Sequence, residues 1–317
     1  MVQALHKDLT MEDWTTWGRL ARNATSRSPI REMARVEIED PIIPGVRPPP
    51  RLGHRVAPAL DGLGAGRHGI RRIDAWDAHP EMLTKLGAPV TGLDLSRWPR
   101  KTTRAMGRVA RLALHATQAA LEQAGIDEDL RAGGRLGLAY GSTHGSTEAW
   151  EKFALTLETP NALLGLGSNA YLKFASHTCA ANLAVTLGIR GRITTTCSAC
   201  VAAAQAIGAG YEAVHYGLQD VMITGGAEEM HYMNAVTFDL LMATSHKFND
   251  TPDESPRPFD AARDALVIRA GGGALVLESL DPARARRGVI RAELAGCARH
   301  RDRPPPHSSP PQPPQLR

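Results

Sequence analysis

The chain of 317 residues has only four cysteines and no apolar run of about 18 residues, the length that a membrane-spanning helix requires. Four cysteines argue against a small scaffold held together by disulfides. We also find no secretory signal at the N-terminus. From these absences we expect free thiols in a reducing, cytoplasmic setting, with no membrane partner.

The chain also lacks an excess of one charge outside its C-terminal end, although its pI is near 9.0. Residues 1–50 carry seven basic and seven acidic side chains, and residues 297–317 carry four and one. The remaining body, residues 51–296, has 26 basic against 25 acidic side chains. A body so close to neutral does not predict a nucleic-acid partner.

Between about residues 64 and 296 the apolar pattern alternates between the periods of strands and helices. We expect strands at 135–140, 192–196, 221–224 and 274–278 (after a glycine-rich bend at 271–273), with another from Val289, and helices at 101–124, 177–187, 200–216, 234–243 and 282–287. This alternation predicts a layered α/β fold. Residues 1–63 are poorly patterned, and residues 297–317, with seven prolines, are expected to be a disordered tail.

The most informative stretch runs from Arg192 to Gly208, where a β-branched run leads into an alanine-rich helix that opens at Cys200. A thiol at this position faces the unpaired amides of the first helical turn. Those amides and the helix dipole favour the thiolate, the nucleophilic form. The pattern therefore predicts that Cys200 holds an acyl group as a thioester.

Other interpretations of the same residues stay open. Cys197 and Cys200 form a C-x-x-C pair, which also occurs in redox motifs and in zinc sites. A zinc site needs two further ligands, and the other two cysteines, Cys179 and Cys297, are distant in sequence. A third possibility is that Cys200 is an inert, buried thiol.

The remaining candidates are histidines, acidic residues and a glycine-rich loop. Six histidines are candidate bases: His177, His215, His231, His246, His300 and His307. The first two fall in helical runs and are interpreted as packed or surface residues, and the last two lie in the proline-rich tail. The neighbouring Glu228 and Glu229 are expected to be structural, because adjacent residues seldom face one site. The loop Gly141–Gly145 lacks the Gly-Lys-Ser/Thr ending of a phosphate loop.

Several motifs follow one another after Lys101: Thr195-Thr-Cys-Ser-Ala-Cys200 with Ala206-Ile-Gly208, Tyr216–Glu229, Phe238-Asp239 with Ala243-Thr-Ser245, Arg257–Asp264 and Gly271–Glu278. In this order they resemble the N-terminal half of a β-ketoacyl-(acyl-carrier-protein) synthase, a condensing enzyme. The resemblance extends to Gly296, and Asn249-Asp-Thr-Pro252 is similar to the fatty-acid synthase branch. It implies a thiolase-like α-β-α fold, of which residues 64–296 would form the N-terminal half.

The resemblance also implies a chemistry. The family's nucleophile precedes an Ile-Gly pair by seven and eight residues, and Ile207-Gly208 stand at that distance from Cys200. Cys197 is then expected in the core or at a dimer interface. Cys200 would take a fatty acyl chain from an acyl carrier protein, and malonyl carrier protein would lose carbon dioxide and extend that chain by two carbons. No cofactor or metal is implied.

Three departures from the family pattern lead to further expectations. Ala265 and Arg269 replace a glycine and a small residue, so we expect strain in that turn. The family's opening strand is not evident before Gly64. The family's two catalytic histidines and its lysine belong to a C-terminal half, whereas here the resemblance gives way after Gly296 to a composition typical of a shifted reading frame. We therefore expect residues 1–317 alone not to complete a condensation.

Two further expectations concern assembly. The family pairs the strand that corresponds to residues 193–196 across a two-fold axis, which implies a homodimer. A related alternative is a non-catalytic partner subunit similar to a chain-length factor, or a ketosynthase of the polyketide type. Chain-length factors usually lack the nucleophile, whereas Cys200 is present here.

Overall fold

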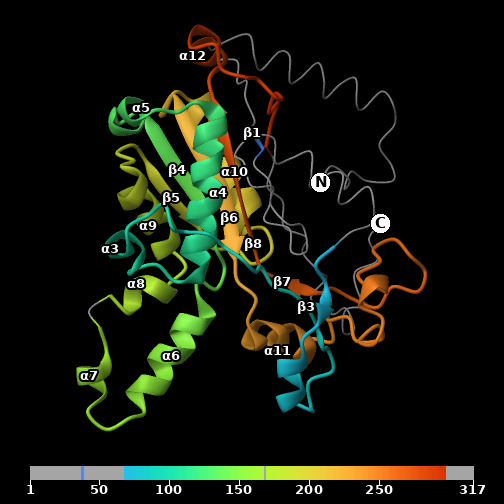
Figure 1. The fold of residues 1–317 in the computed structure, drawn as a ribbon. Coiled ribbons are helices and arrows are strands. Elements are labelled where there is room, and N and C mark those ends of the chain that lie inside the picture. The colour runs from blue at the N-terminus through green and yellow to red at the C-terminus, as the bar shows by residue number, and fades with distance from the viewer. Residues whose placement is uncertain (1–36, 39–67, 168, 298–317) are drawn as a thin grey trace, which may run out of the picture.

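A five-stranded sheet forms the centre of the protein (Figure 1). The computed structural model describes residues 37–38, 68–167 and 169–297, so the expectations for residues 1–63 and 297–317 fall almost wholly outside it. In spatial order the strands are β1 (Glu37–Ile38), β8 (Gly271–Glu278), β6 (Val221–Glu228), β4 (Leu136–Gly141) and β5 (Ile193–Thr196). Strands β6, β4 and β5 are parallel, and β8 is antiparallel to both β6 and β1. Strand β5 therefore forms one edge of the sheet.

Helices cover both faces of this sheet. Helices α4 (Arg108–Ala124) and α9 (Thr178–Leu187) pack on one face, and α10 (Ala202–His215) packs on the other. The side chains of β4 alternate accordingly: Leu138 and Tyr140 face α4 and α9, whereas Ala139 faces α10. Burying one leucine of this kind contributes about 2 kcal/mol. The expected layered α-β-α fold is confirmed.

Glycines end these helices, as the sequence predicts. Gly125 follows α4 in the left-handed conformation with φ 62°, and Gly188 follows α9 with φ 69°. The first expected helix, 101–124, is instead divided into α3 (Arg100–Thr103) and α4. The division comes at Gly107, where a Cβ would lie 2.1 Å from the carbonyl oxygen of Lys173. The backbone is crowded at this point because the segment before α9 crosses it.

Two glycine-rich segments pair as strands, contrary to the expected bend at 271–273. Strand β6 continues past Thr224 to Glu228, and β8 begins at Gly271. Glycine is needed here because the two strands approach closely: a Cβ at Gly225 would lie 2.1 Å from the carbonyl oxygen of Gly273. Tyr140 fills the surface that the glycines leave free and donates a hydrogen bond to that same carbonyl at 3.0 Å.

The strand expected from Val289 is not formed. Residues 288–297 contain no strand, and Val289 and Ile290 are exposed. A strand requires a neighbour for its backbone N–H and C=O groups. Among the described residues no strand lies beside this segment, so its β-branched residues do not produce a strand here.

The remaining elements form a smaller sheet and an extended helical arm. The smaller sheet has the order β2 (Arg71–Arg72), β3 (Leu86–Ala88), β7 (Ile268–Arg269) and lies near η2 (Asp74–Ala78), α11 (Tyr232–Leu240) and η3 (Pro252–Glu254). The arm consists of α6 (Thr147–Leu157), α7 (Ala162–Gly165) and α8 (Tyr171–Phe174); α5 (Glu128–Ala132) and α12 (Leu280–Ala285) lie at the opposite end of the sheet (Figure 1). No described helix is long and apolar enough to cross a bilayer.

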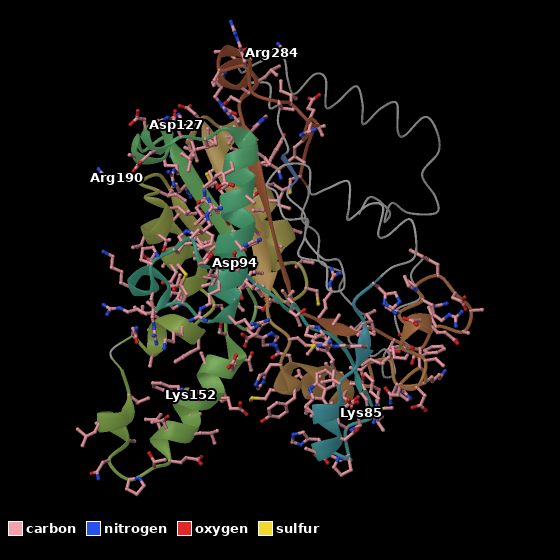
Figure 2. The ribbon with its side chains drawn as sticks, viewed as in Figure 1. Lys85, Asp94, Asp127, Lys152, Arg190 and Arg284 are labelled. Carbon is pink, nitrogen blue, oxygen red and sulfur yellow. The ribbon has the colours of Figure 1, made fainter. Side chains whose placement is uncertain are left out.

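Polar side chains secure the ends of these elements (Figure 2). Lys85, in the region of the smaller sheet, donates to the carbonyls of Trp76 and His79 at 2.9 and 2.8 Å and so closes η2. Asp127 caps α5 by accepting a hydrogen bond from the backbone N–H of Leu130 at 2.8 Å. These contacts fix the periphery, whereas the candidate site lies at the carboxyl edge of the parallel strands.

Candidate active site

Cys200 lies in the loop Cys197–Val201, which joins the edge strand β5 to helix α10; we call it the β5–α10 loop. The helix begins at Ala202 rather than at Cys200, and Val201 is its N-cap residue. Two backbone hydrogen bonds fold the loop: Val201 to Ser198 at 3.2 Å and Ala202 to Ala199 at 3.1 Å. The thiol of Cys200 is exposed at the N-terminal end of α10. This is the strand-to-helix position that the sequence predicts for a nucleophile.

A second loop, Ser142–Ser146, follows β4 and lies against the first; we call it the β4–α6 loop. Strands β4 and β5 are parallel neighbours that end together, with Gly141 opposite Thr196. The hydroxyl of Thr143 donates to the carbonyl of Ala199 at 2.8 Å, and the thiol of Cys197 donates to the carbonyl of Thr143 at 3.3 Å. Because parallel strands end at the same edge, residues far apart in sequence meet here.

The start of α10 packs directly on the ends of these strands. A Cβ at Gly141 would lie 2.6 Å from the backbone of Ala202. The hydroxyl of Thr196 donates to the carbonyl of Ala202 at 2.7 Å, and Ser198 donates to the side chain of Gln205. The helix N-terminus and the Cys200 loop therefore have a fixed position relative to the sheet.

The other three cysteines differ from Cys200 in their surroundings. Cys179 is buried, and its burial, with the charge of Glu228 second, raises the pKa of this thiol well above its usual range. Cys197 is exposed in this chain, so the expected place in the core is wrong, because its thiol points to Thr143 at the loop surface. Cys297 is exposed in the segment after α12. Nowhere in residues 68–167 and 169–297 do three His, Cys, Asp or Glu side chains gather in a way that could hold a metal ion.

The adjacent carboxylates at the end of β6 contact different loops, which agrees with the structural interpretation. Glu228 accepts hydrogen bonds from the backbone of Thr143 and from the hydroxyl of Ser142. Glu229 accepts from the backbone N–H of Glu148 at 2.7 Å, at the start of α6, and its other oxygen is buried without a partner among the described residues. Burial raises the pKa of both carboxyls, that of Glu229 to about 7.

Four of the six candidate histidines lie among the described residues, each in a different contact and none with Cys200. His177 lies 3.4 Å from the hydroxyl of Tyr171, and His215 stacks on Tyr211. His231 pairs with Glu151 at 3.3 Å and precedes α11. The ring of His246 lies 3.2 Å from the carbonyl of Thr244. His300 and His307 lie outside the described residues.

The expected strain at Ala265 and Arg269 is absent. Neither residue has a positive φ, so no glycine is required at either position. Asp264 secures the turn by accepting hydrogen bonds from the backbones of His246 and Lys247 at 2.9 and 3.0 Å. These contacts lower the pKa of Asp264, although its partial burial opposes them.

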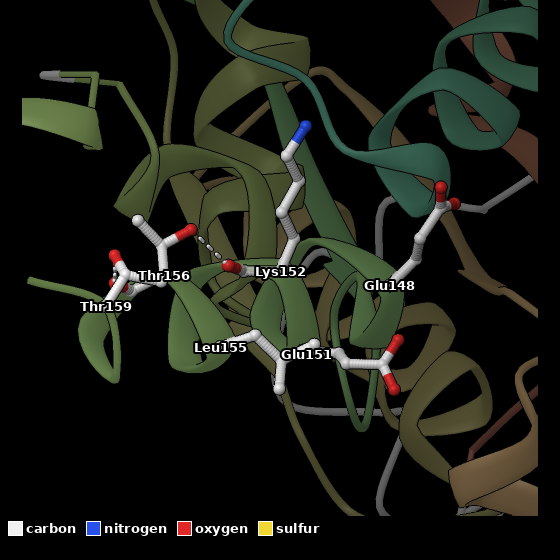
Figure 3. Close-up of a pocket in the computed structure, with 6 residues that line it drawn as sticks. All are labelled: Glu148, Glu151, Lys152, Leu155, Thr156 and Thr159. Carbon is white, nitrogen blue, oxygen red and sulfur yellow. Dashed lines mark hydrogen bonds between the residues drawn. The ribbon is translucent and has the colours of Figure 1, made fainter. Parts of the chain in front are cut away.

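A surface hollow lies elsewhere, along one face of α6 (Figure 3). Six residues of that helix and its end line it: Glu148, Glu151, Lys152, Leu155, Thr156 and Thr159. The lining includes no thiol and no residue of the β5–α10 loop. The hollow therefore adds nothing to the chemistry of Cys200.

Sequence reasoning missed the contacts that hold the β5–α10 loop, above all those of Thr143 with Ala199 and Cys197 and that of Glu228 with Thr143. The signal that could have found them is the end of β4: the loop Gly141–Ser146 follows a buried strand, and neighbouring parallel strands end at one edge. Which strands are neighbours is a property of the topology, which the local pattern of residues does not contain.

Comparison with known proteins agrees with this geometry. Residues 52–283 match the family model described as beta-ketoacyl synthase, N-terminal domain. The chain is 33% identical over 245 residues to the 3-oxoacyl-[acyl-carrier-protein] synthase 1 of Haemophilus influenzae; this covers 77% of the chain and 60% of that relative. The chain thus spans about three fifths of this relative's length.

Solved structures agree as well. A beta-ketoacyl synthase from Burkholderia phymatum is similar with a TM-score of 0.72 and 42% identity, over 81% of this chain and 62% of that one. The ishigamide ketosynthase/chain length factor matches with a TM-score of 0.69 and 25% identity, over 83% and 63%. The fold is thus the thiolase-like fold of ketosynthases. With these matches and the strand-to-helix position of Cys200, the chain belongs to the β-ketoacyl synthase family, whose N-terminal domain it contains.

Proposed function

We propose that Cys200 is an acyl-accepting nucleophile and that its donor is the thioester of an acyl carrier protein. The observation that carries this proposal is the exposed thiol between the end of β5 and the start of α10. The buried Cys179 cannot serve, because its raised pKa keeps it protonated near neutral pH. Relatives named as acyl-carrier-protein synthases support the choice of donor.

The transfer exchanges one thioester for another. The Cys200 thiolate attacks the carbonyl carbon of the carrier-bound acyl group, and the bond from that carbon to the phosphopantetheine sulfur breaks. The released thiolate takes a proton from water. The tetrahedral intermediate carries an oxyanion, and a backbone N–H such as that of Cys200 would stabilise it; such a donor contributes about 3 kcal/mol in other enzymes.

In a complete synthase, the second step would be a condensation. Malonyl carrier protein would lose carbon dioxide, and the resulting carbanion would attack the carbonyl of the Cys200 thioester. The Cys200 thiolate would leave, and the chain would be longer by two carbons. This step belongs to the proposal for the whole protein, with fatty-acid synthesis as the proposed pathway.

We also propose a homodimer formed through β5. The strand lies at the sheet edge, and the side chain of Ile193 is 47% exposed. An exposed edge strand with β-branched residues is a ready template for another strand. Light scattering at micromolar concentration should give twice the mass of one chain, and a stable monomer would contradict the dimer.

A second candidate function follows from the similarity to the ishigamide ketosynthase/chain length factor. In that case the chain would be a non-catalytic partner of a true ketosynthase, or a ketosynthase of the polyketide type. The presence of Cys200 favours the acyl-accepting function. Covalent acylation distinguishes a non-catalytic partner, which would gain no acyl group, from a ketosynthase of either the fatty-acid or the polyketide type.

Intact-mass spectrometry after incubation with an acyl carrier protein thioester tests the proposal. The unaltered chain should gain the mass of one acyl group, and C200S should gain none at that site. The matched control is C197S, which changes the neighbouring exposed cysteine and should still be acylated. A folded chain that gains no adduct would favour the partner-subunit function.

A further inference from the structure

Thr143 uses each of its polar groups at the point where the two loops meet. Its backbone N–H donates to Glu228, and its hydroxyl donates to the carbonyl of Ala199 at 2.8 Å. Its own carbonyl accepts from the thiol of Cys197 at 3.3 Å and from the hydroxyl of Ser176 at 2.8 Å. Thr143 therefore connects the end of β6, through its backbone N–H, with the loop that carries Cys200, through its hydroxyl.

The residue that the Thr143 hydroxyl contacts has an unusual backbone. Ala199 has φ 46°, in the left-handed region, which costs a residue with a Cβ about 1–2 kcal/mol. Ala199 also directly precedes Cys200. A return of Ala199 to negative φ would redirect the chain just before the thiol and change its position relative to the start of α10. The conformation persists only if surrounding contacts hold it.

Glu228 holds Thr143 from the other side. One carboxylate oxygen accepts from the backbone of Thr143, and the other accepts from the hydroxyl of Ser142 at 3.4 Å. That hydroxyl in turn accepts from the backbone N–H of Gly145 at 3.1 Å. Glu228 thus holds Ser142 and Thr143 directly and Gly145 through Ser142, and it leaves the Thr143 hydroxyl directed at Ala199.

We propose that Thr143 is a positioning residue that holds Ala199 in its left-handed conformation and thereby fixes Cys200 at the start of α10, and that Glu228 fixes Thr143. The inference rests on the proposed nucleophilic role of Cys200 and deepens it. It assigns to the β4–α6 loop a function in nucleophile geometry, although that loop contains no reacting group.

The first experiment compares T143V with T143S in the full chain. Both keep the backbone contacts of residue 143, but only serine keeps the hydroxyl. The readout is the rate at which iodoacetamide labels Cys200, followed by peptide mapping that separates the four cysteines. We expect T143V to lower the Cys200 rate about three- to tenfold, the effect of one lost hydrogen bond, and T143S to stay within about twofold. The rate at Cys297 serves as the internal reference.

The second experiment asks whether A199G restores the Cys200 labelling rate that T143V loses. A loss of packing at residue 143 would not be restored in this way. Glycine adopts positive φ without the cost that alanine bears. A199G alone should label at nearly the unaltered rate, and A199G combined with T143V should restore most of the loss. A double variant that labels as slowly as T143V would overturn the assigned route through Ala199.

The third experiment asks whether Glu228 and Thr143 act through one chain of contacts. E228A combined with T143V should lose no more than the larger single loss, because residues that act in series are not additive. E228Q, which retains one acceptor oxygen, should lose less than E228A. The matched control is E229Q, whose carboxylate contacts α6 instead, and it should leave the Cys200 rate unchanged.

The labelling rates distinguish failure of the proposed nucleophilic role of Cys200 from failure of the proposed positioning role of Thr143. If the unaltered chain labels Cys200 no faster than Cys297, the nucleophilic role and the positioning proposal both fail. If Cys200 is preferred and T143V labels it at the unaltered rate, the nucleophile stands and the positioning proposal fails. Losses from E228A and T143V that multiply would also overturn the series arrangement.

Discussion

Glu229 should make the stability of this protein depend on pH, and E229Q should remove that dependence. Its side chain is 2% exposed, and one of its oxygens has no hydrogen-bond partner among the described residues. Burial in these surroundings raises its pKa from 4.5 to about 7, while the backbone N–H of Glu148 opposes the shift. The carboxyl is therefore neutral in the folded protein over a range where the unfolded chain is ionised.

Proton linkage gives the direction and the size of the change in stability with pH. Between pH 4.5 and about 7 the folded state holds a proton that the unfolded state has released. The free energy of unfolding therefore falls as pH rises through this range, by about 3 kcal/mol in total. The stabilisation is fully present below pH 4.5 and is lost above pH 7.

E229Q carries no ionisable group at this position. At pH 5 it should be less stable than the unaltered protein by no more than about 1 kcal/mol, because its amide places two N–H donors where the neutral carboxyl places one O–H. At pH 8 the unaltered protein bears the ionisation penalty and the variant does not. The stability of E229Q relative to the unaltered protein should therefore improve by about 3 kcal/mol from pH 5 to pH 8.

Urea unfolding followed by circular dichroism at both pH values measures this difference. E158Q, which changes an exposed carboxylate just after α6, is the control and should show no such crossover. A difference between E229Q and the unaltered protein that is the same at pH 5 and pH 8 would refute the reasoning about Glu229.

Two further outcomes are expected. R286M should lower the free energy of unfolding by about 3–5 kcal/mol in thermal melts, because it removes the guanidinium that lies 2.7 Å from the buried carboxylate of Glu278; E278Q/R286M should recover much of that loss. G145A should unfold at a clearly lower temperature, since a Cβ there would lie 1.8 Å from the Phe174 carbonyl and φ is 65°; G296A, with open space, is its control.

The layered fold could be predicted from the sequence because the local signals for strands, helices and helix ends agree with one another. The alternation at Leu138 and Ala139 separates the two faces of the sheet, and Gly125 and Gly188 end helices where positive φ is needed. The position of Cys200 between a strand and a helix was predictable for the same reason: strand, turn and helix are adjacent in the chain. Each of these features is encoded within about twenty residues.

The features that were missed depend on partners far away in sequence. Gly271–Gly273 have the composition of a bend, but they form a strand because Gly225 and Gly226 lie beside them. Val289 has the composition of a strand, but within the described structure it has no neighbour. The contact between Thr143 and Ala199 joins residues 56 positions apart, and no local pattern predicts it.

The residues that hold the Cys200 loop are translated at different times. Thr143 is made before Cys200, but Glu228, which holds Thr143, is made 28 residues after it. At about 5–20 residues per second, a ribosome needs on the order of 1–6 seconds to add those residues. During that interval the nascent chain contains the thiol and the Thr143 hydroxyl without the carboxylate that aligns them. The proposed nucleophile is therefore translated before all the contacts that hold its loop can form.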